Sequence, residues 1–178
     1  MDTEFKRFVR ISAGIQNYDF PIFSISLLKR AAADFERKEK SAPLPVPSGA
    51  KDGKVAVIGS GPAGLAAAYN LRRKGYGVTV FETLPEAGGM AAVGIPDYRL
   101  PLDILRHEIG LIGDTGVEIA LNSGIGKIDM DDFRKKGYQA LFLAVGAHAG
   151  NRMGVKGEET KCDGLVDGVE FLRDLNLG

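Results

Sequence analysis

Cysteine and long apolar runs are nearly absent from this sequence, and each shortage removes a class of protein. Cys162 is the single cysteine among 178 residues, so neither an internal disulfide nor a CxxC redox pair can form. An iron–sulfur cluster within this chain is excluded for the same reason, because such a cluster takes about four cysteine ligands. No uninterrupted apolar stretch approaches the roughly 20 residues that a membrane span needs.

Net charge is lacking as well. The 23 Lys and Arg residues balance the 23 Asp and Glu residues, so charge indicates neither a nucleic acid nor a membrane surface as partner. A hydrophobic content of 44% is typical of a soluble globular protein. The N-terminus mixes charged and apolar residues and does not resemble a signal peptide. We therefore expect a cytoplasmic protein in a reducing compartment.

Three zones follow one another along the chain. Residues 1–42 are an N-terminal helical segment, in which apolar residues at steps of three and four predict an amphipathic helix at 24–40. Its apolar stripe either packs on the main domain or meets a partner. Residues 43–53 are a Pro-rich linker, because alternate prolines favour extended chain. Residues 54–178 form the main domain.

The main domain alternates short apolar runs with amphipathic stretches. We expect strands at residues 54–59, 77–82, 117–121 and 138–147, helices at 62–75, 100–116 and 129–137, and a weakly helical tail at 164–178. Such alternation is typical of a parallel sheet with helices on both faces, joined by right-handed crossovers. The predicted fold is therefore α/β and doubly wound, of the Rossmann-like type.

A glycine-rich turn, "GSGPAG", follows the first predicted strand and opens the first predicted helix. GxGxxG is a weak signal alone, but this position is where a dinucleotide site requires it. Gly59 allows the tight turn, Gly61 lets the pyrophosphate approach, and Gly64 permits close packing of helix on strand. The helix start near Pro62 offers unpaired N–H groups and a partial positive charge to phosphates.

Glu82 ends the second predicted strand, where an acid meets the adenosine ribose of a bound dinucleotide. Its carboxylate accepts hydrogen bonds from ribose hydroxyls and repels a 2′-phosphate, which argues against NADP at this turn. FAD and NAD both remain open on these residues.

A second glycine pair, Gly88-Gly89, follows within one short loop and lets backbone pass close to an extended cofactor. From Val55 to Gly89 the chain resembles two-dinucleotide-binding flavoproteins. With "GIPDYRLP" it is similar to the glutamate synthase small subunit and its relatives, including the flavin domain of dihydropyrimidine dehydrogenase. The motifs "GVEIALNSGIG", "YQALFLAVGA" and "VKGEE…GVEFL" continue in that family's order, so the resemblance covers residues 54–178.

The resemblance implies FAD as cofactor, with NAD(P)H as co-substrate of the complete enzyme. It assigns the pyrophosphate to the glycine turn, the ribose to Glu82 with Thr83, and the flavin end to Gly89 with Met90. Arg99 would contact the cofactor near the flavin or pyrophosphate, and Ile125 would cover the adenine. The full set of implied cofactor-binding residues is Gly59, Ser60, Gly61, Pro62, Ala63, Gly64, Glu82, Thr83, Gly88, Gly89, Met90, Arg99, Ile125, Ala144, Val145 and Gly146.

The sequence also departs from that family. It has no cysteines ahead of the flavin domain and no second GxGxxG for a nicotinamide domain. We therefore expect an incomplete FAD-binding part of an NAD(P)H-dependent flavin oxidoreductase, as a homodimer or with a partner electron-transfer subunit, and assign neither catalytic residue nor metal ligand.

The alternative is a non-catalytic FAD- or ADP-binding subunit that docks a partner in an electron-transfer complex. An NAD-dependent dehydrogenase domain is a third reading, which Gly88-Gly89 and "GIPDYRLP" disfavour. His107 and His148 lack catalytic spacing and are expected to serve structure or face solvent.

Overall fold

The computed structural model describes residues 25–39, 43–46, 49–126, 129–151, 153–160 and 164–178. The chain divides into two units, residues 1–43 and 44–178. The first unit contributes helix α2 (Ile25–Lys38). This helix matches the one expected at 24–40; residues 24 and 40 themselves lie outside the described residues. On α2, Arg30 and Arg37 reach Asp34 at 3.8 and 3.9 Å.

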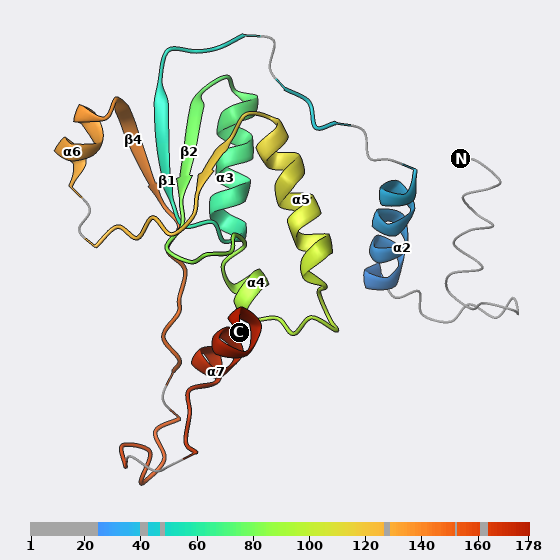
Figure 1. Cartoon of the computed structure of the whole chain (residues 1–178), viewed down its shortest axis with the longest axis vertical. Helices are drawn as coiled ribbons and strands as arrows, with labels where there is room; N and C mark the ends of the chain where they lie inside the picture. The colour runs from blue at the N-terminus through green and yellow to red at the C-terminus, as the bar shows by residue number, and fades with distance from the viewer. Residues whose placement is uncertain (1–24, 40–42, 47–48, 127–128, 152, 161–163) are drawn as a thin grey trace, which may run out of the picture. The chain divides into compact units, whose positions relative to one another are not determined.

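The described part of the second unit contains a four-stranded parallel sheet in the order β3-β2-β1-β4 (Figure 1). Its strands are β1 (Lys54–Ile58), β2 (Gly77–Phe81), β3 (Glu118–Ala120) and β4 (Tyr138–Leu143). Strand β1 lies in the middle, which explains its unbroken apolar sequence, because a central parallel strand is covered on both faces.

Helices cover both faces of this sheet, as the alternating pattern predicts. They are α3 (Pro62–Arg73), α5 (Leu102–Asp114) and α6 (Met130–Lys135), whereas α4 (Met90–Val93) and α7 (Gly168–Leu177) pack against each other beyond the ends of the strands. Helix α3 packs on β1 and β2 and is followed outward by α5, whereas α6 lies against β4 (Figure 1). The fold is therefore Rossmann-like.

Alternate residues of β1 supply the two halves of the core. Val57 packs with Val80 and with Ala68 of α3 on one face. Ala56 and Ile58 face the other way, toward Phe133 of α6. There the ring of Phe133 meets those of Phe81 and Tyr138 edge-on, with each pair of centroids 5.7 Å apart, a geometry that aromatic pairs favour.

Three expectations need correction. Strand β4 ends at Leu143 rather than at residue 147, and it is half-exposed rather than buried, because it is an edge strand with Leu143 58% accessible. Helix α4 was not expected, since four residues are too short to display a helical period. The tail is a regular helix from Gly168 to Leu177, whose N-cap Asp167 accepts hydrogen bonds from the amides of Val169 and Glu170.

Strand order decides where a ligand can bind. The chain leaves β1 toward β2 on one side and returns to β4 on the other. The loops that follow β1 and β4 therefore diverge, and open α/β sheets bind ligands in the crevice at this point, beyond the carboxyl ends of the strands. Among the described residues, no helix combines the length and the apolar character needed to cross a membrane.

Candidate functional site

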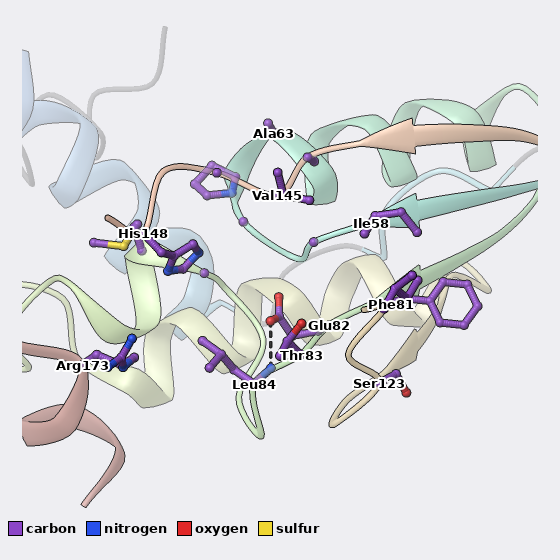
Figure 2. A pocket seen from close by; sticks show the side chains of 18 residues that line it. Ile58, Ala63, Phe81, Glu82, Thr83, Leu84, Ser123, Val145, His148 and Arg173 are labelled. Atoms are coloured by element: carbon purple, nitrogen blue, oxygen red, sulfur yellow. Dashed lines mark hydrogen bonds between the residues drawn. The ribbon is translucent and has the colours of Figure 1, made fainter. Parts of the chain in front are cut away.

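A pocket of about 440 Å³ lies at the carboxyl ends of β1, β2 and β4 (Figure 2). This volume is within the range of ligand sites, roughly 300–1,000 Å³. The residues that line it are Ile58, Gly59, Gly61, Pro62, Ala63, Phe81, Glu82, Thr83, Leu84, Gly89, Met90, Ser123, Ile125, Ala144, Val145, Gly146, His148 and Arg173. Segments far apart in sequence therefore meet beyond the carboxyl ends of the strands.

The glycine turn forms the floor between β1 and α3. Gly59 has φ of 103°, which favours glycine, and its amide donates to the Phe81 carbonyl at 2.8 Å. Gly61 is the N-cap of α3, and a Cβ there would have no atom within 4 Å. The turn is therefore open toward the pocket at Gly61, where the first amides of a 12-residue helix begin. An anion fits this position.

Gly64 has a different role from that of Gly61. A Cβ at Gly64 would collide with the carbonyl oxygen of Gly59 and lie 3.3 Å from the Ala144 Cβ. Its lack of a side chain lets α3 pack closely on the ends of β1 and β4, as the sequence predicts for the third glycine of the motif.

Glu82 follows β2 directly and is 6% exposed. Its Oε2 accepts hydrogen bonds from the Ser60 amide at 2.9 Å and the Ser60 hydroxyl at 2.5 Å. Its Oε1 accepts one from the Leu84 amide at 2.9 Å, the dashed line in Figure 2. Burial alone raises the pKa of this carboxyl, but hydrogen bonds from Leu84, Ser60 and the Thr83 amide together hold the pKa below its ordinary value. The site thus contains a buried, ionised carboxylate.

The second glycine pair, Gly88-Gly89, packs against the glycine turn that follows β1. Gly89 has φ of 54°, and a Cβ there would lie 2.8 Å from the Cα of Gly61. The two glycine segments thus touch, backbone against backbone. Helix α4 starts directly afterwards at Met90 and buries Ala92 and Val93.

Twelve of the sixteen residues predicted from the sequence line this pocket. Ser60, Gly64 and Gly88 lie behind the lining: Ser60 donates to Glu82, Gly64 packs against Gly59 and Ala144, and Gly88 donates to Ser60. Arg99 does not line it: it is exposed in the turn before α5, with its guanidinium 6.0 Å from the ring centroid of Tyr98. Its contact with a cofactor stays a prediction.

Six lining residues were not predicted: Ile58, Phe81, Leu84, Ser123, His148 and Arg173. Arg173 is brought there by α7, which Asn176 anchors through a 2.9 Å hydrogen bond to the Val93 carbonyl. Arg173 also lies 3.6 Å from Glu170 and 3.4 Å from Asp174. Nothing in the local sequence connects residues 83 positions apart, so only the folded chain shows these neighbours.

Within the described part of the chain, no three His, Cys, Asp or Glu side chains gather as a metal site would require. The fold and pocket define a dinucleotide-binding domain of the doubly wound class, with a glycine turn for phosphates and an acid at the end of the second strand.

The family model of the pyridine nucleotide-disulphide oxidoreductases matches residues 53–177. The chain belongs to this family.

Named relatives agree with that assignment. The chain is 48% identical over 183 residues to the NADP(+)-dependent formate dehydrogenase subunit beta of Moorella thermoacetica, covering 90% of this chain and 26% of that protein. It is 45% identical to the NADPH-Fe(3+) oxidoreductase subunit beta of Geobacter sulfurreducens, covering 87% and 24%. It is 38% identical to the glutamate synthase [NADPH] small chain of Escherichia coli, covering 67% and 25%, which confirms the resemblance inferred from its motifs. The chain spans about a quarter of each relative.

Solved structures give the same fold. FprA from Mycobacterium tuberculosis, in complex with NADPH, superposes with a TM-score of 0.54 at 20% identity, covering 61% of this chain and 26% of that one. At this identity the likeness concerns the fold alone.

Substitutions of the second and third glycines of the motif, Gly61 and Gly64, are predicted to have opposite outcomes. We expect Gly61→Ala to leave the thermal unfolding temperature nearly unchanged, because the new Cβ enters open space, and to lower FAD affinity by at least about tenfold, or about 1.4 kcal/mol. Gly64→Ala should destabilise the fold by about 1–3 kcal/mol through overpacking against Gly59. Calorimetric unfolding and FAD titration separate the two effects. Equal losses of stability in both variants would contradict the different roles.

Glu82 predicts a pH dependence of stability. Because its pKa is lower in the folded chain than its ordinary 4.5, its stabilising contribution is present above that value and lost as pH falls through the folded pKa. We expect the difference in free energy of unfolding between wild type and Glu82→Gln, measured in urea, to shrink below about pH 4.5. Glu86→Gln, which removes a partly exposed ion pair with Arg106 at 2.6 Å, serves as control and should change the free energy of unfolding much less than Glu82→Gln does, because solvent screens such pairs. A pH-independent difference for Glu82→Gln would contradict the assignment.

Proposed function

We propose that this chain is the FAD-binding module of an NAD(P)H-dependent flavin oxidoreductase of the glutamate-synthase-small-subunit type. One observation carries the proposal: a buried, ionised Glu82 and an open Gly61 face the same pocket, which the Gly88-Gly89 loop borders. Family membership and the flavin-type resemblance of residues 54–178 support it.

Charge at the ribose position favours FAD over NADP in this turn. The relatives' names include NADP(+) and NADPH, yet a 2′-phosphate beside the Glu82 carboxylate would meet like charge in a buried setting. Both observations agree if the turn holds the adenosine of FAD and the nicotinamide nucleotide binds elsewhere in the complete enzyme. FAD, when bound, would take hydride from NAD(P)H and pass electrons onward singly.

The chain's own residues would bind and orient the cofactor. The amides at the start of α3 would bind the pyrophosphate, and Glu82 would accept from ribose hydroxyls. Ile125 lines the pocket together with Phe81 and Ile58, and it would cover the adenine. Met90 and the segment from Ala144 to Gly146 would form the remaining walls. Of the lining residues, Arg173 is the one with a permanent positive charge, and we propose that it faces the anionic or electron-rich part of the cofactor.

Exposed apolar side chains support a partner for this chain. Leu143 is 58% exposed at the sheet edge, and Phe171 and Leu175 of α7 are 55% and 64% exposed. Apolar surface of this kind often marks an interface. The printed names of the relatives describe subunits, so we propose a homodimer or an electron-transfer partner subunit, in the cytoplasm.

The proposed function is tested by a visible absorption spectrum of the purified chain after incubation with FAD, repeated anaerobically with NADH and then NADPH. We expect a flavin spectrum that neither nucleotide bleaches, because the chain contains no second glycine-rich nucleotide motif. Bleaching would reveal a hydride site within this chain or its dimer. Absence of bound flavin would contradict the proposal for the chain alone.

Glu82→Ala provides the site-specific arm of that experiment. A hydrogen bond to a charged group contributes about 1.5–3 kcal/mol, so we expect FAD affinity to fall by about tenfold to a hundredfold. Equal retention in the variant would overturn the ribose assignment. The alternative function, a non-catalytic FAD- or ADP-binding subunit, predicts that bound flavin stays oxidised even when the partner subunit and NAD(P)H are both supplied.

A further inference from the structure

Ser60 lies at the junction of three segments of the pocket without lining it. The side chain is fully buried, with 0% of the residue exposed. It follows β1 within the glycine turn, and it meets both the acid after β2 and the loop before α4. A buried hydroxyl needs hydrogen-bond partners within the protein.

The Ser60 hydroxyl is a donor and an acceptor at once. It donates to Glu82 Oε2 at 2.5 Å and accepts from the Gly88 amide at 3.0 Å. The Ser60 amide donates to the same Oε2 at 2.9 Å. One residue thus connects the carboxylate to a backbone amide 28 positions from the serine. Gly88 is buried and does not line the pocket, so its amide has no ready access to water in place of Ser60.

These bonds also decide which oxygen of Glu82 remains for a ligand. A carboxylate oxygen offers about two lone-pair positions, and Ser60 fills both positions on Oε2. Oε1 accepts from the Leu84 amide at 2.9 Å, so a ribose hydroxyl would bind at Oε1, where the Thr83 amide is a competing donor. Without the Ser60 hydroxyl, the carboxylate could rotate and offer a mixture of both oxygens.

We propose that Ser60 is a positioning residue that locks Glu82 with Oε1 toward the ribose and ties the Gly88-Gly89 loop to the glycine turn. The two glycine segments then form as one unit, and the acid meets its ligand in a single orientation. The ligand side of this proposal rests on the proposed function, whereas the link between Ser60 and the Gly88 loop does not.

The first test needs no ligand. Hydrogen–deuterium exchange is compared for wild type, Ser60→Ala and Thr79→Val. Thr79 is the matched control because it also donates a buried hydroxyl to a carboxylate, Glu118 Oε2 at 2.9 Å, but away from the pocket. We expect peptides covering residues 84–92 to exchange at least about tenfold faster in Ser60→Ala alone, with β1 unchanged in both variants. Unchanged exchange at 84–92 would overturn the link.

The second test measures how Ser60 acts on Glu82. ADP and FAD are titrated into wild type, Ser60→Ala, Glu82→Gln, the double variant and the control Thr79→Val. We expect Ser60→Ala to weaken ADP binding by about tenfold, and by less than about twofold in the Glu82→Gln background, because residues that act together are not additive. A full loss in both backgrounds, or a loss no larger than in Thr79→Val, would overturn the positioning role. If Ser60→Ala does not fold, Ser60→Cys, whose thiol is a weak donor and acceptor, replaces it in both tests.

Failure of the proposed function has a different signature. If wild type binds neither ADP nor FAD while the exchange difference at residues 84–92 is found, the nucleotide assignment is wrong and the structural link stands. If wild type binds both ligands and Ser60→Ala binds them equally well, the nucleotide assignment stands and the positioning role is wrong.

Discussion

The pocket depends on holding a charged carboxylate out of water at the end of β2. An ionised Glu that is 6% exposed is costly unless donors surround it. Here the donors come from the loop after β1 and from the residues just past Glu82 itself. The same bonds that stabilise the charge therefore fix the relative position of the ends of β1 and β2. Binding chemistry and local fold are supported by one set of contacts.

The second constraint is the close approach of the Gly88-Gly89 backbone to the glycine turn. It follows from the bonds that Ser60 makes to Glu82 and Gly88. Once Ser60 is held against Glu82, the Gly88 amide reaches the serine hydroxyl and Gly89 comes against Gly61. Side chains at these positions would separate the segments or fill the space over the start of α3. The glycines of the first motif thus serve different needs: Gly61 leaves open space beside the start of α3, whereas Gly64 allows close packing against Gly59.

The sequence predicted the sheet, its parallel direction and most of the pocket, because those features have local signals. β1 is apolar after Lys54, α3 begins after a glycine turn, and Glu82 directly follows the next strand. It did not predict that β4 is a half-exposed edge strand, because the sequence of an apolar strand does not show whether other elements cover that strand. Nor did it predict Arg173, whose place depends on α7 docking beside α4 through Asn176.

This difference separates the two ends of the pocket. The end at Glu82 is built from residues within about one βαβ unit, so spacing along the chain reports it. The end at His148 and Arg173 is assembled by segments that follow β4, beyond any motif of that unit (Figure 2). In the proposed function the first end would bind the pyrophosphate and the adenosine ribose. Selectivity for the rest of the cofactor would then come from the second end, which Arg173 of α7 lines.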